Sequence, residues 1–298
     1  MVRQYKIHTN LDGTDDKVWD VTNGKVRFYQ PSNLGLQSTN NIWQSNGIGV
    51  MGTRSITQPQ IEFKLETFGE SLEENYRLMK DFINDILNQK FVTLEYQTEI
   101  FQVYADLALA DITKTEGYGK NGTFSEKITF DIITKWYTYE NLTFDMVQNG
   151  KVISGKSKIY GGTAPGYYKY VKGTSYTYYG ETNIERLGRW DIKDEIFSFM
   201  GILYPKLPKT PTGVRFLDDI GNEYTAIVFK TEELQDYILI NTDVNDETYQ
   251  GWKGTTALNL FPVMDFERYR TRIIEKGQME LINLSKAEFK IKRKADFV

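Results

Sequence analysis

Residues 71–106 read SLEENYRLMKDFINDILNQKFVTLEYQTEIFQVYAD, and they hold the one sustained helical pattern of the chain. Ser71 followed by Glu74 is typical of a capping box, in which both side chains accept amide hydrogens left free at the first turn. Steps of three and four residues predict one face of an α-helix. The apolar residues at these steps are Tyr76, Met79, Ile83, Ile86 and Leu87. We therefore expect a helix from Ser71 to about Asn88.

Two runs after this helix, 91–96 and 100–104, are rich in the aromatic and β-branched residues that strands prefer. Residues 61–68 alternate between apolar and polar, which predicts a half-buried strand. Further strands are expected at 3–8, 17–21, 26–29, 124–136, 213–229 (a hairpin), 237–241, 258–263, 279–284 and 288–291. A lone helix in such a chain needs a sheet to cover its apolar face. We predict a mainly β fold with the helix bracing the first domain.

The composition of the whole chain excludes several classes of function. The chain has 298 residues, enough for two domains, and a net charge of −4 gives no reason to expect nucleic-acid binding. It has no cysteine and a single histidine, His8, so thiolate or histidine metal cages are excluded and a serine-based triad would depend on His8 alone. The N-terminus carries no secretory pattern, and no apolar run is long enough to span a membrane. We expect no membrane association.

Residues 31–52 are rich in Ser, Asn and Gly and weakly periodic, so we interpret them as a long loop of the kind that is often functional. Gly47, Gly49 and Gly52 match the spacing G-x-G-x-x-G. A dinucleotide site needs a strand before this motif and a helix after it, and neither is expected here. We therefore predict a glycine-rich loop and no cofactor.

No pattern supports catalysis or a metal site. Residues 241–247 place oxygen-bearing side chains at alternate positions, but the glycine and glutamate that a calcium loop requires are absent, so a turn between strands is the better interpretation. A weak surface calcium site stays open as the alternative. Pairs of acids such as Asp218 and Asp219 are ordinary in a chain with 40 acidic residues. We predict that the protein is not an enzyme and assign no catalytic, cofactor or metal residue.

Residues 146–180 contain no acid, five lysines and seven tyrosines, with frequent glycines and few aliphatic side chains. A long surface loop is one interpretation, and single-stranded nucleic-acid binding is a weaker one. The third is an extension that grips another protein, because tyrosine combines a large ring with a hydrogen-bonding tip. Its candidate partner-binding residues are Tyr160, Tyr167, Tyr168, Tyr170, Tyr176, Tyr178 and Tyr179.

The second half returns to short strands separated by turns, which predicts a β-sandwich. Its end, Lys290 to Lys294, alternates and is basic. Lysines often protect the edge of a sheet, so we expect an edge strand there with a solvated face.

The order of elements resembles the distal tail proteins of siphophages. It runs from a β-meander through a glycine-rich loop, a strand and a capped helix to the hairpin FVTLEYQTEIFQVYAD and the strand ITFDIITKWYTYEN. The stretches TSYTYYGETNIERLGRW and FSFMGILYPKLPKTPTGVRFLDDIGNEYTAIV are similar to lactococcal members in particular. The resemblance covers essentially the whole chain.

That resemblance implies a tail-tube-like N-terminal β-sandwich (1–135) with one helix and a protruding hairpin, and a galectin-like C-terminal domain (136–298). An arm-like insertion is expected within about 146–230, and the proline-rich run 204–211 is a second candidate for it. The implied role is a structural hub of the tail baseplate, a hexameric ring in the virion at the tail tip. Its implied partners are the tail tube protein, the tail tip protein and receptor-binding protein trimers, with DNA passing through the channel.

The hairpin of Phe91 to Tyr104 is expected to pair with the neighbouring subunit through its strand edges. The candidate ring-interface residues are Phe91, Leu94, Tyr96, Phe101, Val103 and Tyr104. The alternative function is a carbohydrate-binding β-sandwich module. Against it, the sugar-binding pattern of galectins is absent, because His8 lies in the other domain and neither Trp190 nor Trp252 fits that pattern.

Overall fold

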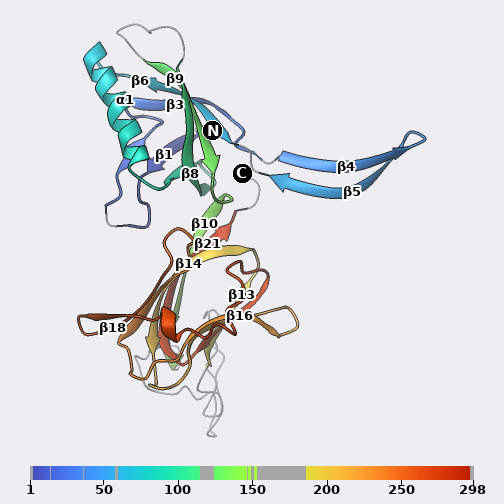
Figure 1. Cartoon of the computed structure of the whole chain (residues 1–298), viewed down its shortest axis with the longest axis vertical. Helices are drawn as coiled ribbons and strands as arrows, with labels where there is room; N and C mark the ends of the chain where they lie inside the picture. The colour runs from blue at the N-terminus through green and yellow to red at the C-terminus, as the bar shows by residue number, and fades with distance from the viewer. Residues whose placement is uncertain are drawn as a thin grey trace. The chain divides into compact units, whose positions relative to one another are not determined.

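The structure is a computed structural model that describes residues 3–13, 15–35, 37–57, 60–114, 124–145, 147–148, 151–152 and 186–295 (Figure 1). The chain divides into two compact units, one formed by residues 1–138 with 295–298 and the other by residues 139–294. Strands dominate both units, and α1 (Leu72–Leu87) is the one α-helix of the described residues. The predicted mainly β fold with a single helix is confirmed.

The first unit contains a sheet that curls into two layers, with strands in the order β2-β1-β7-β8-β9-β6-β3. The strands are β1 (Gln4–His8), β2 (Val18–Asp20), β3 (Val26–Ser32), β6 (Ile61–Thr67), β7 (Val92–Gln97), β8 (Gln102–Thr113) and β9 (Ser125–Ile132). The long strand β8 joins the layers, since it pairs with β7 over 102–107 and with β9 over 107–113. Side chains of the two layers meet between them: the rings of Tyr5 and Phe63 lie 5.5 Å apart, edge to face.

Helix α1 begins and ends almost where the sequence predicted. Ser71 is the N-cap, and its Oγ accepts the amide hydrogen of Glu74. The Glu74 carboxylate accepts the amide hydrogen of Glu70 instead of that of Ser71, so only half of the predicted capping box forms. The predicted buried face was wrong in part. The buried residues are Asn75, Met79, Phe82 and Ile86, whereas Tyr76 and Leu87 are more than 60 % exposed.

Phe82 places the helix on the core of this unit. Its side chain is fully buried and lies edge to face with Trp19 on β2, with ring centroids 5.2 Å apart. Phe28 on β3 also packs against Phe82, at 5.8 Å. The Trp19 Nε1–H donates to Asp85 on the helix at 2.9 Å. Thus the helix packs against the sheet, as expected. The face that it buries is rotated about the helix axis from the predicted buried face.

The stretch predicted as a long glycine-rich loop is a two-stranded antiparallel ribbon, β4 (Gln37–Ser45) and β5 (Ile48–Thr57). Asn46 and Gly47 form its turn with φ values of 50° and 79°, the left-handed conformation that tight hairpins require. The ribbon extends away from the sheet of its unit (Figure 1). The loop prediction was wrong because neither strand has a buried side, so neither shows the alternation that marks a strand.

The second unit is a sandwich of two antiparallel sheets. One has the order β10-β21-β14-β17-β18-β19 and the other the order β13-β20-β15-β16. The first contains β10 (Tyr137–Asp145, which starts in the first unit), β14 (Ile196–Pro205), β17 (Tyr237–Asn241), β18 (Thr248–Lys253), β19 (Thr256–Asn259) and β21 (Leu284–Lys294). The second contains β13 (Arg186–Ile192), β15 (Thr212–Leu217), β16 (Glu223–Phe229) and β20 (Gly277–Ile282). Phe199 on β14 and Phe216 on β15 meet between the sheets, 5.8 Å apart.

Two strand predictions in this unit need correction. The expected strand 258–263 stops at Asn259, and the 3₁₀ helix η3 (Phe261–Val263) follows, because Pro262 has no amide hydrogen to offer a ladder. The basic C-terminal strand is not an edge, since β21 lies between β14 and β10. Its Lys292 is buried, and its ammonium group is neutralised by Asp243.

Candidate interaction surfaces

The ribbon β4–β5 carries large apolar side chains into solvent. Trp43 is 68 % exposed and pairs across the ribbon with Val50, which is 61 % exposed. Ile48, two residues before Val50, is 70 % exposed and lies on the same face. Ile42 and Met51 oppose each other on the other face and are about half exposed. Both faces of the ribbon therefore expose large apolar side chains near its turn.

These ribbon residues were missed as candidates. The signal that could have found them is the dipeptide Asn46-Gly47 followed by the β-prone run IGVMG, which together predict a hairpin. Isolated two-stranded ribbons are marginally stable in water. Exposed apolar side chains on a ribbon that packs against no described sheet therefore indicate a protein interaction surface.

Half of the six residues predicted at the ring interface are buried inside their own unit. Leu94, Tyr96 and Val103 are buried in the core, whereas Phe91, Phe101 and Tyr104 are partly exposed. Both edges of the hairpin are occupied within the chain, since β7 pairs with β1 and β8. The other edge of β8 pairs with β9 and, at Tyr104, with β10. The strand edges expected to pair with a neighbouring subunit are therefore taken up within the chain, and the hairpin that extends from the sheet is β4–β5 (Figure 1).

The seven candidate tyrosines from Tyr160 to Tyr179 lie outside the described residues. Short strands β11 (Val147–Gln148) and β12 (Lys151–Val152) pair just before them. The second arm candidate, 204–211, does not protrude. It connects β14 to β15, and the Asn283 side chain donates to the carbonyl oxygens of Leu207 and Thr210 and to the Thr212 hydroxyl. That connection is part of the sandwich.

His8 belongs to a buried polar cluster at one end of β1. Its Nδ1 lies 2.6 Å from Asp16 Oδ2 and its Nε2 lies 2.9 Å from Glu95 Oε2 on β7. Lys6 Nζ lies 2.8 Å from the other Glu95 oxygen. Both ring nitrogens face carboxylates of the chain itself, and no serine or threonine hydroxyl contacts the ring among the hydrogen bonds of the described residues. The cluster ties β1, β7 and the 9–17 turn together.

Residues 241–247 form the connection between β17 and β18. The side-chain oxygens of Asn241 and Asp243 accept amide hydrogens of Asp243 and Asn245, as in a turn held by its own side chains. Asp243 also binds Lys292. Across the described part of the chain, no group of three or more His, Asp or Glu side chains is placed to hold a metal ion.

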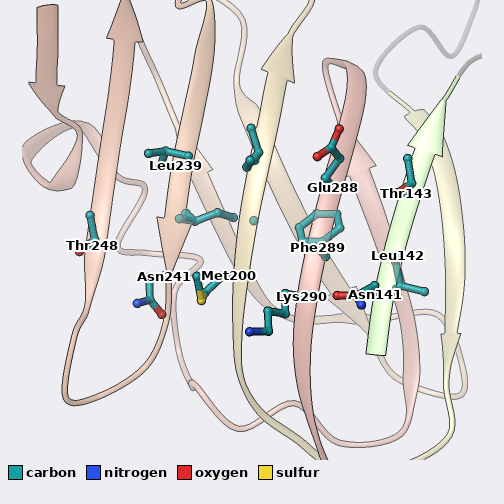
Figure 2. A pocket seen from close by; sticks show the side chains of 13 residues that line it. Asn141, Leu142, Thr143, Met200, Leu239, Asn241, Thr248, Glu288, Phe289 and Lys290 are labelled. Carbon is teal, nitrogen blue, oxygen red and sulfur yellow. The ribbon is translucent and has the colours of Figure 1, made fainter. Parts of the chain in front are cut away.

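A groove of about 510 Å³ lies on the outer face of the six-stranded sheet of the second unit (Figure 2). It is lined from β10, β14, β17, β18 and β21. Met200 and Leu239 form its apolar part, and Asn141, Thr143 and Thr248 present polar groups from flanking strands. Sequence reasoning missed this site, because its residues are far apart in the chain and belong to strands whose order was unknown.

Comparisons with known proteins match both units. The family profile described as "Distal tail protein, N-terminal domain" matches residues 4–133, and that described as "Dit, C-terminal domain" matches residues 135–298. The distal tail proteins of Lactococcus phage p2 and Lactococcus phage SK1 are 94 % and 91 % identical to the chain, over the full length of all three proteins.

Solved structures give the same result. A chain in the structure of the phage P2 baseplate in its activated conformation with Ca is 94 % identical, with a TM-score of 0.79 and full coverage of both chains. The crystal structure of the SPP1 Dit protein shares the fold at 10 % identity, with a TM-score of 0.54 over 99 % of this chain and all of that one. This chain belongs to the distal tail protein (Dit) family.

Proposed function

We propose that the protein is the structural hub of a siphophage tail baseplate, in which six copies form a ring at the tail tip of the virion. The observation that carries this proposal is the full-length similarity, at 94 % identity, to a chain of a phage baseplate. In this role the ring joins the tail tube protein to the tail tip protein and to receptor-binding protein trimers. DNA passes through the channel of the ring without sequence-specific contacts, which agrees with a net charge of −4.

The ribbon β4–β5 supports a subunit contact in such a ring. Trp43, Ile48 and Val50 expose apolar area in the single chain, and packing against an adjacent subunit would bury it. The outer edges of β4 and β5 also have peptide groups free for pairing, because the described strands pair β4 only with β5. We propose that each ribbon lies against the adjacent subunit and that closure of this head-to-tail contact makes the ring.

The residues that the sequence predicted at the ring interface contribute less to the subunit contact in this proposal. Phe91, Phe101 and Tyr104 retain exposed surface and can contribute directly to a subunit boundary. Leu94, Tyr96 and Val103 are buried in their own subunit, so their contribution is to hold β7 and β8 in place. A hub assembled in this way is a structural protein.

The tyrosine-rich residues 146–180 remain the proposed arm for receptor-binding trimers. Their composition supports the proposal, since tyrosine and glycine without acids are typical of adaptable protein-binding surfaces. Deletion of 146–180 with a short glycine linker should leave the two units folded and abolish capture of the trimers in a pull-down. Capture at the wild-type level would refute the assignment of the arm.

Light scattering coupled to size exclusion tests the ribbon contact. The double variant Trp43→Ser, Val50→Ser should convert the hexamer into lower oligomers without changing the circular dichroism spectrum. The matched control is Ile220→Ser, which removes an 84 % exposed apolar side chain from the β15–β16 turn and should leave the hexamer intact. An unchanged hexamer in the ribbon variant would show that another surface closes the ring.

A further inference from the structure

The groove on the second unit combines an apolar floor with polar walls. Met200, Ile202 and Leu239 project from adjacent strands β14 and β17 on the outer face, where they are half-buried. Side-chain amides and hydroxyls stand on both sides: Asn141 and Thr143 on β10, and Asn241 and Thr248 on β17 and β18. A ligand that matches this surface needs aliphatic faces and hydrogen-bonding edges within the same small volume.

The floor of the groove does not favour recognition through the main chain. Among the described strands, the floor strands β21, β14 and β17 are each paired on both edges, so the floor of the groove presents no free strand edge. An extended peptide that binds by adding a strand to a sheet therefore has nothing to pair with. Recognition in the groove must rest on side chains.

The charges in the groove favour a neutral ligand. Its two charged residues, Glu288 and Lys290, lie on β21 and carry opposite signs (Figure 2). Glu288 forms an ion pair with Lys286, and the Lys290 ammonium group lies 4.0 Å from the centroid of the Tyr139 ring. The two charges of the lining therefore sum to zero, so the groove has no net charge that would select an anionic or a cationic ligand.

An aromatic pair extends the same face beyond the floor. Tyr237 lies two residues before Leu239 on β17 and therefore on the same side of the sheet. Trp252 is its partner on β18, and the two rings are stacked with centroids 6.0 Å apart and an interplanar angle of 14°. Stacked rings offer a broad, rigid apolar surface at low entropic cost.

We infer that this groove binds a short neutral saccharide, with its sugar C–H faces on Met200, Leu239 and the aromatic pair. Its hydroxyl groups hydrogen-bond to the side chains of Asn141, Thr143 and Thr248. A volume of about 510 Å³ accommodates a ligand of a few sugar rings. The site lies within the second unit alone and uses none of the residues proposed for the ring or the arm, so its test is independent of theirs. It also uses no histidine, unlike the galectin pattern.

Saturation-transfer difference NMR on the full-length protein tests the site with three defined neutral trisaccharides: maltotriose, chitotriose and globotriose. We expect saturable binding of at least one of them. Met200→Lys and, separately, Thr248→Lys should weaken that binding at least tenfold, because each places a long charged side chain in the groove. The control Ile220→Lys introduces the same charge on an exposed turn and should leave binding unchanged.

Two results would overturn the inference. One is the absence of saturable binding for all three trisaccharides at millimolar concentration. The other is binding that both groove variants retain at wild-type affinity, which would place the saccharide elsewhere. The circular dichroism spectrum and thermal midpoint of each variant distinguish a blocked groove from an unfolded second unit.

Discussion

Lys292 Nζ on β21 lies 2.9 Å from Asp243 Oδ2 in the β17–β18 connection, and the two side chains are only 6 % and 13 % exposed. This ion pair neutralises a lysine inside the sheet that the sequence assigned to a solvated edge. Leaving one buried charge without its partner typically costs about 3–5 kcal/mol, whereas replacing both partners by neutral groups is often tolerated.

We therefore predict that Asp243→Asn lowers the free energy of unfolding by several kcal/mol, and that adding Lys292→Met recovers a large part of the loss. Urea titration of the full chain measures both. The control Lys253→Met removes a lysine from the exposed pair with Glu233 and should change stability by less than about 1 kcal/mol. Equal losses for the buried and the exposed pair would contradict this account.

The cluster of Lys6, His8, Asp16 and Glu95 predicts sensitivity to acid. Burial by itself raises the pKa of Glu95, but hydrogen bonds from Lys6 and His8 outweigh it, so the pKa lies below its ordinary value of 4.5. A carboxylate with a depressed folded-state pKa contributes stability above the unfolded value and loses that contribution as pH falls through the folded value.

Glu95→Gln should thus be less stable than the wild type at pH 7, with the difference shrinking as pH falls below about 4.5. Unfolding midpoints in urea at pH 7, 5, 4 and 3.5 provide the comparison. Glu99→Gln, at an exposed position in the next turn, serves as control and should follow the wild-type curve. A gap that stays constant down to pH 3.5 would mean that the Glu95 charge does not stabilise the fold.

The helix face can be tested directly. Phe82→Ala removes a fully buried ring and should cost about 3–5 kcal/mol, whereas Tyr76→Ala, at a side chain 63 % exposed, should cost little. Scanning calorimetry of the two variants provides the measurement. A larger loss of stability in Tyr76→Ala than in Phe82→Ala would show that the helix buries the face expected from the sequence.

The N-cap gives a smaller, independent effect. Ser71→Ala removes the Oγ that accepts the Glu74 amide hydrogen, which should cost about 1 kcal/mol. Ser71→Asp keeps an acceptor at this position and should behave like the wild type. A loss of the same size in both variants would indicate that something other than the cap is disturbed.

Strands with one buried side were predictable, because their side chains point alternately to the core and to solvent and the sequence alternates between apolar and polar residues accordingly. The strand Ile61–Thr67 follows the expectation for 61–68 closely, with Ile61, Phe63 and Leu65 facing the core. The cap at Ser71 was also predictable, because it depends on neighbouring residues. Local chemistry and period were sufficient in both places.

Elements whose environment is set by distant residues were not predictable from pattern. Gln37–Ser45 has no buried side, so it gave no alternation and was assigned to a loop. Asn75 faces inward because its side chain accepts the Gly69 amide hydrogen, which a scale of hydrophobicity does not register. The groove around Met200 and Leu239 joins five strands from distant parts of the sequence, and only their order in the sheet brings its residues together.

The ring is the central claim, and electron microscopy of the purified full-length protein tests it most directly. Class averages of particles viewed along the ring axis give the rotational symmetry without any assumption about the contact surfaces. We predict six-fold averages with a central channel, lost in the variant Trp43→Ser, Val50→Ser. Averages with a different symmetry, or closed particles without a channel, would contradict the account.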